Sequence, residues 1–95
     1  MVIGTLELQL RIDGSFSLKD KRRVVRSLMD RCRREFRVSM AEVGDQELWN
    51  CALLGVACVS NDVGHAEAVL QSVIDLADAM AEVEVVEAAK AIRRM

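Results

Sequence analysis

One segment near the N-terminus alternates so regularly between apolar and polar residues that it restricts the fold more than any other feature. The segment VIGTLELQLRI covers residues 2–12. One face carries Gly4, Leu6, Leu8, Leu10 and Ile12, and the other carries Thr5, Glu7, Gln9 and Arg11. A strand of this kind belongs to a sheet that is covered on one side and open to water on the other. The chain must therefore supply enough helix to cover one face only.

The next segment, SLKDKRRVVRSLMDRCRREFRV at residues 17–38, has helical periodicity. Ser17 is the expected N-cap, and Asp20 completes a variant of the capping box three residues later. Apolar residues recur every three or four positions and predict the buried side of this helix: Val25, Leu28, Met29, Cys32 and Phe36.

The remaining elements follow from similar patterns. RVSMAEV, residues 37–43, predicts a short strand, and GDQE, residues 44–47, predicts a hairpin connection. LWNCALLGVACVS, residues 48–60, is apolar on both faces and predicts a central strand. A second helix is expected after a cap at Ser60 or Asn61, with this apolar stripe: Val63, Ala66, Val69, Leu70, Val73, Ile74, Ala77 and Met80. VEVVEA, residues 83–88, predicts the last strand.

The element order βαββαβ predicts an α+β fold, a ferredoxin-like sandwich formed by residues 1–95 as a single domain. Two right-handed crossovers would place both helices on the same face of a four-stranded antiparallel sheet. The opposite face would stay open, and a strand starting at residue 48 would direct Trp49, Cys51 and Leu53 onto it.

Several functional classes find no support in the sequence. No apolar run approaches the roughly 20 residues of a membrane span, and the N-terminus has no features of a secretion signal, so we expect a cytoplasmic bacterial protein without membrane contact. Three cysteines without a CxxC pair argue against a disulfide framework or a zinc site. Cys32, among arginines, is the one candidate for a reactive thiol.

Catalytic motifs are also missing from the sequence. His65 is the sole histidine, and no serine–histidine–aspartate set or glycine-rich phosphate loop is present. We therefore expect a protein that is not an enzyme and that needs no cofactor and no metal. An enzyme of another type would need a pocket that gathers His65 or Cys32 with carboxylates.

Charge is distributed very unevenly along the chain. Residues 17–38 hold nine basic and three acidic residues, a net charge of +6, whereas the rest of the chain holds four basic and twelve acidic residues, a net charge of −8. Two interpretations stay open: the wet face of an ordinary amphipathic helix, or a surface that binds the phosphates of RNA or of the ribosome. The residues predicted to bind nucleic acid are Lys19, Lys21, Arg22, Arg23, Arg26, Arg33, Arg34 and Arg37.

The alternative function is a protein–protein or homodimer contact through the open face of the sheet. Trp49, Leu53 and Val43 would form its apolar patch. Sheets of this topology that read RNA stack bases on aromatic residues of their central strands. Because Phe16, Phe36 and Trp49 are the only aromatic residues of the chain, such a platform is not expected on this sheet.

Three segments resemble the YlxP-like family, small bacterial proteins grouped as a domain of unknown function. They are SLKDKRRVV, EVGDQELWN and GVACVSND, and the resemblance extends from Met1 to about Met80. It implies a ferredoxin-like fold, no assigned enzyme activity and genes beside those of transcription and translation factors, as for a ribosome- or RNA-associated protein. The motif positions that carry over are Ser17, Leu18, Lys19, Lys21, Arg22, Arg23, Glu42, Gly44, Asp45 and Trp49.

Overall fold

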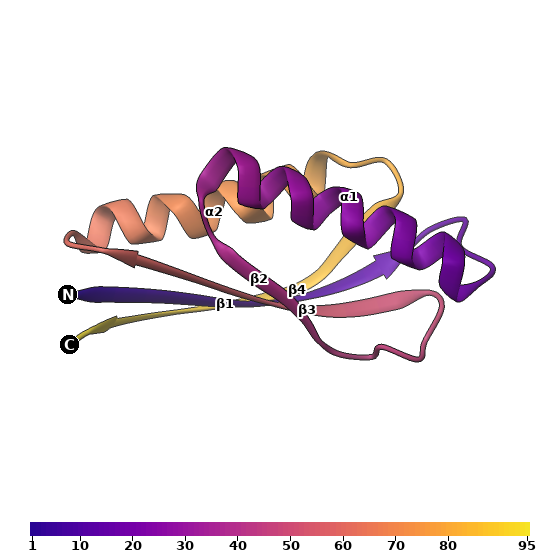
Figure 1. Ribbon diagram of the computed structural model, residues 1–95, viewed down its shortest axis with the longest axis horizontal. Coiled ribbons are helices and arrows are strands. Elements are labelled where there is room, and N and C mark those ends of the chain that lie inside the picture. Colours follow the sequence, from indigo (N-terminus) through magenta and orange to yellow (C-terminus); the bar gives the residue numbers. More distant parts are fainter.

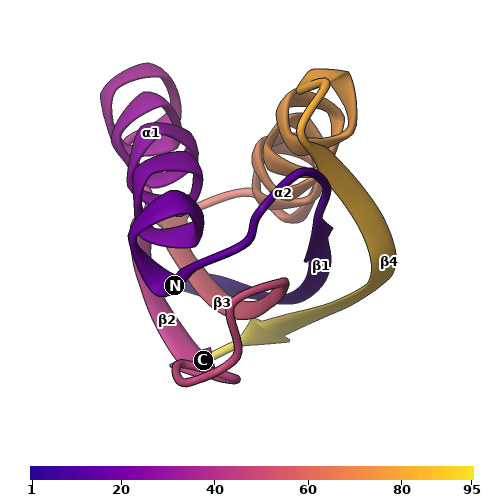
Figure 2. The ribbon, with the colours of Figure 1, turned by 90° about the vertical axis from the view of Figure 1, so that its right-hand side faces the viewer.

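The computed structural model describes residues 1–95 and has the predicted element order (Figure 1). Its elements are β1 (Val2–Ile12), α1 (Leu18–Phe36), β2 (Ser39–Gly44), β3 (Cys51–Ser60), α2 (Val63–Ala79) and β4 (Val83–Arg94). The four strands form one antiparallel sheet in the order β2-β3-β1-β4. Both helices lie on the same face of this sheet (Figure 2). The predicted ferredoxin-like sandwich is confirmed.

The alternation of β1 determines which face of the sheet is buried. Leu6, Leu8 and Leu10 are at most 1% exposed beneath the helices, whereas Glu7 and Arg11 are exposed on the open face. β1 pairs with β3 on one side and β4 on the other. The alternation of this central strand therefore shows which face of the sheet is covered by the helices and which is open, as predicted.

Helix α1 begins and ends with recognisable caps. The Ser17 hydroxyl accepts a hydrogen bond from the Asp20 backbone N–H at 3.1 Å, and the Asp20 carboxylate accepts one from the Phe16 N–H at 3.1 Å. The helix ends at Phe36, because Arg37 adopts the left-handed conformation with φ 53°. The predicted apolar stripe is confirmed at Val25, Leu28 and Cys32; Met29 and Phe36 are only partly buried, and Val24 and Lys21 join the buried side.

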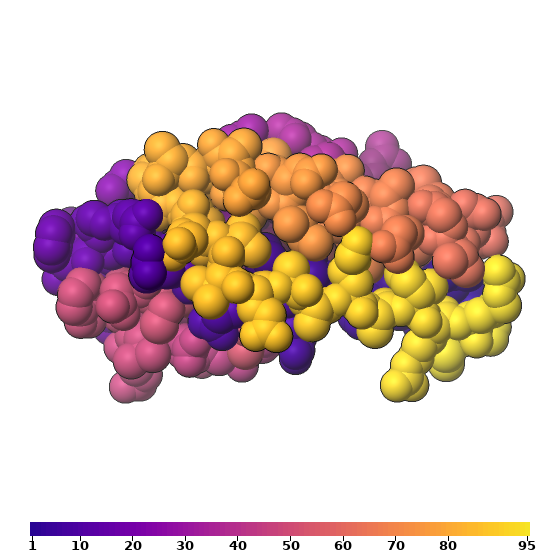
Figure 3. Space-filling model, turned by 180° about the vertical axis from the view of Figure 1, so that it is seen from behind, coloured from indigo at the N-terminus to yellow at the C-terminus, as the bar shows by residue number.

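Helix α2 covers the other half of the sheet above β1 and β4, and Figure 3 shows it lying along β4. Its N-cap is Asp62, not the predicted Ser60 or Asn61: the Asp62 carboxylate accepts the His65 N–H at 2.8 Å. Gly4 permits the close packing of α2 on β1, since a Cβ there would lie 3.1 Å from Leu70 Cδ1. Neither helix has the length and apolar character needed to cross a membrane.

Strands β2, β3 and β4 differ from the predictions at their boundaries. β2 covers Ser39–Gly44 instead of the predicted residues 37–43, because Arg37 ends α1. β3 begins at Cys51, three residues after the predicted start, because residues 45–50 form a loop between β2 and β3. β4 continues to Arg94, six residues beyond the predicted end, because it pairs with nearly the whole of β1. A bulge between Gln9 and Leu10 shifts the register of that pairing.

Candidate nucleic-acid interface

The outer face of α1 carries a row of basic side chains that is interrupted by Asp30. Seven of the eight predicted nucleic-acid-binding residues are exposed. Six of them lie on α1 at helical spacings of three, four or seven positions, so they share the side that faces away from the sheet, and Arg37 follows at the C-cap. We call this set the basic stripe: Lys19, Arg22, Arg23, Arg26, Arg33, Arg34 and Arg37. Its first turns border a shallow hollow of about 580 Å³ with no hydrophobic lining residue.

Each acidic residue of α1 already has a partner close to it in the sequence. Asp30 lies 3.6 Å from Arg33, Glu35 lies 3.9 Å from Arg31, and Asp20 accepts the Phe16 N–H at the helix start. Arg33 also donates to the Met40 carbonyl at 2.7 Å, which ties it to β2. Six members of the basic stripe consequently have no ion pair: Lys19, Arg22, Arg23, Arg26, Arg34 and Arg37.

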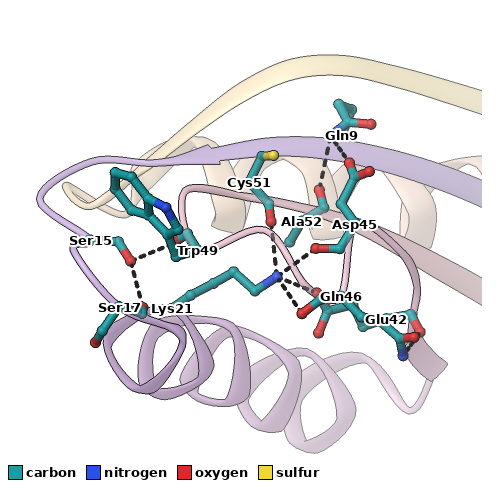
Figure 4. Close-up of polar contacts among 10 residues, drawn as sticks. All are labelled: Gln9, Ser15, Ser17, Lys21, Glu42, Asp45, Gln46, Trp49, Cys51 and Ala52. Atoms are coloured by element: carbon teal, nitrogen blue, oxygen red, sulfur yellow. Dashed lines mark hydrogen bonds and ion pairs between the residues drawn. The ribbon is translucent and has the colours of Figure 1, made fainter.

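Lys21 is not part of this surface, and its prediction as a phosphate contact is wrong. Its side chain is 0% exposed and points inward beneath the loop 45–50 (Figure 4). The ammonium donates to the carbonyl oxygens of Asp45 at 2.8 Å, Cys51 at 3.0 Å and Gln46 at 3.3 Å. A buried ammonium with three acceptors cannot reach a nucleic acid outside.

A carboxylate completes the surroundings of Lys21. Glu42 Oε2 lies 2.9 Å from the Lys21 nitrogen. It is buried without a hydrogen bond of acceptable geometry, because the three N–H groups of the ammonium are directed at the three carbonyls. The contact is therefore an ion pair that balances the buried charge, and Lys21 joins α1 to β2 and to the loop 45–50.

Trp49 lies in that loop and not on the open face of the sheet, so its predicted position is wrong. The loop residues preceding β3 are held by Lys21 and by a hydrogen bond from Gln9 Nε2 to Asp45 Oδ2 at 2.9 Å, so the strand alternation does not extend to residue 49. The Ser15 hydroxyl donates to the Trp49 carbonyl. The indole stacks on Phe16, with ring centroids 6.4 Å apart and planes inclined by 25°.

Val43 and Leu53 do lie on the open face, as predicted. Leu53 is opposite Gln9, and Val43 lies over Gly55. Beside Val43 the face is hollowed over about 610 Å³, and small side chains dominate its floor: Thr5, Ser39, Ala41, Gly55, Ala57, Ala89 and Ala91. The patch predicted around Trp49 is therefore divided between this face and one end of the molecule.

Of the two candidate catalytic side chains, His65 lines a pocket of about 430 Å³ that Glu35 and Cys58 also line, whereas Cys32 lines no pocket. His65 Nδ1 lies 3.1 Å from the Ser60 hydroxyl at the start of α2, with no carboxylate in hydrogen-bonding contact with its ring. Cys32 is 0% exposed in the core. No cluster of three or more histidine, cysteine, aspartate or glutamate side chains could hold a metal ion.

Cys32 is expected to be unreactive toward thiol reagents in the folded protein. Burial raises the pKa of its thiol to about 11, with Glu35 adding to the rise and Arg31 opposing it, so the thiol stays protonated at pH 8. Mass spectrometry after brief iodoacetamide treatment at pH 8 should find Cys32 unmodified, and modified once urea unfolds the chain. Rapid native labelling of Cys32 would contradict this assignment.

The fold and this surface define a class of protein: a small ferredoxin-like domain with one strongly basic helix. The chain belongs to the family described as "Protein of unknown function (DUF503)", whose family model matches residues 3–90. This confirms the family to which the three sequence segments pointed.

Two individual proteins illustrate these relationships. The chain is 35% identical over 83 residues to "Uncharacterized protein YlxP" of Bacillus subtilis (strain 168), an alignment that covers 87% of this chain and 90% of that protein. Among solved structures it is similar to the de novo designed protein LFR1 1 with ferredoxin fold, with a TM-score of 0.51 and 12% identity. That similarity covers 96% of this chain and 86% of the design and shows the fold alone.

Proposed function

We propose that the protein is a non-enzymatic binding module that contacts RNA, free or in the ribosome, through the basic stripe. The observation that carries this proposal is the set of six unpaired cations on one exposed helix face. Like charges held along one face repel one another, and a polyanion removes that repulsion while releasing its own counterions.

The length of the stripe favours a polymer over a single anion. Positions 19 to 36 extend about 26 Å along the helix at 1.5 Å per residue, and Arg37 follows at its C-cap. That distance suits a row of phosphates, whereas one small anion would engage two or three of the side chains. The gene neighbourhood implied by the family resemblance directs the proposal toward RNA and the ribosome.

The second helix determines how such a polymer would lie. Its exposed positions include Asp75 and Asp78, which have no ion pair, and it carries no lysine or arginine; Glu67 is paired with Lys90 of β4 at 2.6 Å. Phosphates would be repelled from α2 and attracted to α1, so the RNA would follow the axis of α1 on the side away from α2.

Reversing two stripe charges, Arg22→Glu/Arg26→Glu, should weaken binding to ribosomal subunits and to a short RNA hairpin by at least about tenfold at low salt. The matched control is Arg93→Glu/Arg94→Glu, which changes net charge equally at two exposed β4 positions without ion pairs. Fluorescence anisotropy measures the hairpin, co-sedimentation measures the subunits, and circular dichroism verifies folding.

The control variant should bind nearly as well as the unmodified protein. Equal losses in both variants would show that net charge, not the stripe, determines binding. Absence of binding by the unmodified protein to both RNA and ribosomal subunits would refute the proposal. If a duplex DNA of the same length is bound equally well, the proposed partner is nucleic acid in general and not RNA alone.

A further inference from the structure

Two exposed aromatic rings stand at the end of the molecule where α1 begins. Phe16 is 82% exposed and Trp49 is 45% exposed, although Phe16 immediately precedes the N-cap and Trp49 lies 33 positions further along the chain. The segment after β1 and the loop between β2 and β3 lie side by side at this end (Figures 1 and 3). Two of the three aromatic residues of the chain are therefore placed at one exposed spot.

Hydrogen bonds next to the rings hold this pair in place. The Phe16 N–H donates to Asp20, and the Trp49 carbonyl accepts from the buried Ser15. Lys21 binds carbonyls on both sides of Trp49, at Gln46 and at Cys51. The backbone next to both rings is thus fixed by contacts within the fold, while both rings remain accessible to solvent.

The rings adjoin the basic stripe. Lys19 follows Phe16 within the first turn of α1, and Arg22 and Arg23 lie in the next turn. One helical turn advances about 5 Å. Proteins that bind single-stranded nucleic acid combine these two features, cations that follow the backbone and aromatic faces on which bases stack.

We propose that Phe16 and Trp49 form a stacking site for an unpaired nucleobase of the RNA whose phosphates lie on the basic stripe. This inference rests on the proposed function and specifies its ligand: single-stranded RNA, or a single-stranded end beside a helix. The 6.4 Å separation and 25° inclination describe an offset stack, which leaves ring surface uncovered. The sequence did not reveal the site, because nothing local relates residue 16 to residue 49.

The chain supplies its own reporter, since Trp49 is its one tryptophan. The probes are an eight-nucleotide oligouridylate and an abasic ribose-phosphate oligomer of the same length, which have matched phosphates and differ in their bases. We expect the oligouridylate to quench Trp49 emission and to bind at least about tenfold more tightly than the abasic oligomer. Equal quenching and equal affinity for the two probes would overturn the inference.

Phe16→Ala provides the matching variant, because a ring that is 82% exposed contributes little to the fold. It should reduce the affinity for the oligouridylate toward that for the abasic oligomer and leave the latter unchanged. Val59→Ala, at a position 68% exposed and away from these rings, should change neither. A Phe16→Ala protein that retains the preference for bases would also overturn the inference.

The two proposals fail in different ways. If both oligomers bind equally and Arg22→Glu/Arg26→Glu abolishes both, the basic stripe binds phosphates and the stacking site is refuted. If the oligouridylate is preferred but the reversals have no effect, the stacking site is supported and the stripe is refuted. Binding of neither oligomer overturns the stacking site, and binding to the RNA hairpin then decides the proposed function separately.

Discussion

Replacing Lys21 with methionine is expected to lower the free energy of unfolding by about 3–5 kcal/mol, the usual cost of removing one partner from a buried ion pair. Methionine has a similar length and fills much of the space, so the loss is mainly electrostatic. It would leave Glu42 Oε2 buried without its cation and the carbonyls of Gln46 and Cys51 without the Lys21 donor, whereas the Asp45 carbonyl keeps the Leu48 N–H at 3.0 Å. Urea unfolding followed by circular dichroism measures the change.

Lys19→Met is the matched control for this experiment. It makes the same substitution in the same helix, two positions away, at an exposed side chain without an ion pair. Its effect should stay within about 0.5 kcal/mol. For a domain of this size, the expected difference between the variants is at least about 12 °C in melting temperature. Similar stabilities for the two variants would show that the buried ammonium is dispensable.

A double variant tests whether the unpaired carboxylate of Glu42 causes the loss of stability expected for Lys21→Met. Lys21→Met/Glu42→Met removes both charges, so no carboxylate remains buried alone. Replacing a whole buried ion pair by apolar side chains is often neutral, whereas breaking it is costly. The double variant should therefore be more stable than Lys21→Met. A double variant that is less stable would attribute the loss to the carbonyl hydrogen bonds or to packing.

The position of Lys21 could have been predicted from the sequence, although its charge concealed it. Residues four, seven and eleven positions later are Val25, Leu28 and Cys32, all on the buried side of α1. Helical periodicity alone therefore places Lys21 on the apolar face. The surrounding residues KDKRR made it resemble one more surface cation, and its partners lie 21 to 30 positions away.

The position of Trp49 could not be predicted in this way. The segment LWNCALLG is apolar on both faces, as a central strand would be, and no glycine or proline at residues 48–50 marks these residues as a loop. The strand starts at Cys51 because residues of the preceding loop bind distant groups, Ser15 and Lys21. The end of β4 also escaped prediction, since AAKAI has weak strand preference and owes its conformation to pairing with β1.

Two of the three segments that resemble the YlxP-like family contact each other around Lys21. SLKDKRRVV supplies Lys21 and EVGDQELWN supplies Glu42, Asp45 and Trp49, so the two segments are joined by the buried ion pair and by the loop carbonyls. The first segment also supplies Lys19, Arg22 and Arg23, which remain outside. One short stretch therefore contains both a structural lysine and the beginning of the proposed RNA surface.

The salt dependence of RNA binding should report about six phosphate contacts and not the eight counted from the sequence. Each contact with single-stranded nucleic acid contributes about −0.7 to the slope of log affinity against log salt concentration. Six unpaired cations give a slope near −4, whereas eight would give nearly −6. The difference arises because Lys21 is buried and Arg33 is bound to Asp30 and to the Met40 carbonyl.

The variants Lys19→Met and Lys21→Met separate phosphate binding from stabilisation of the fold. Lys19→Met should make the slope shallower by about 0.7 and leave stability unchanged, because its ammonium has no ion pair within the fold and would contact only the phosphate of the proposed partner. Lys21→Met, measured at a temperature where circular dichroism shows it folded, should keep the slope and lose stability. A change of slope in Lys21→Met, or none in Lys19→Met, would contradict this assignment, since the buried ammonium already has its three acceptors inside the fold.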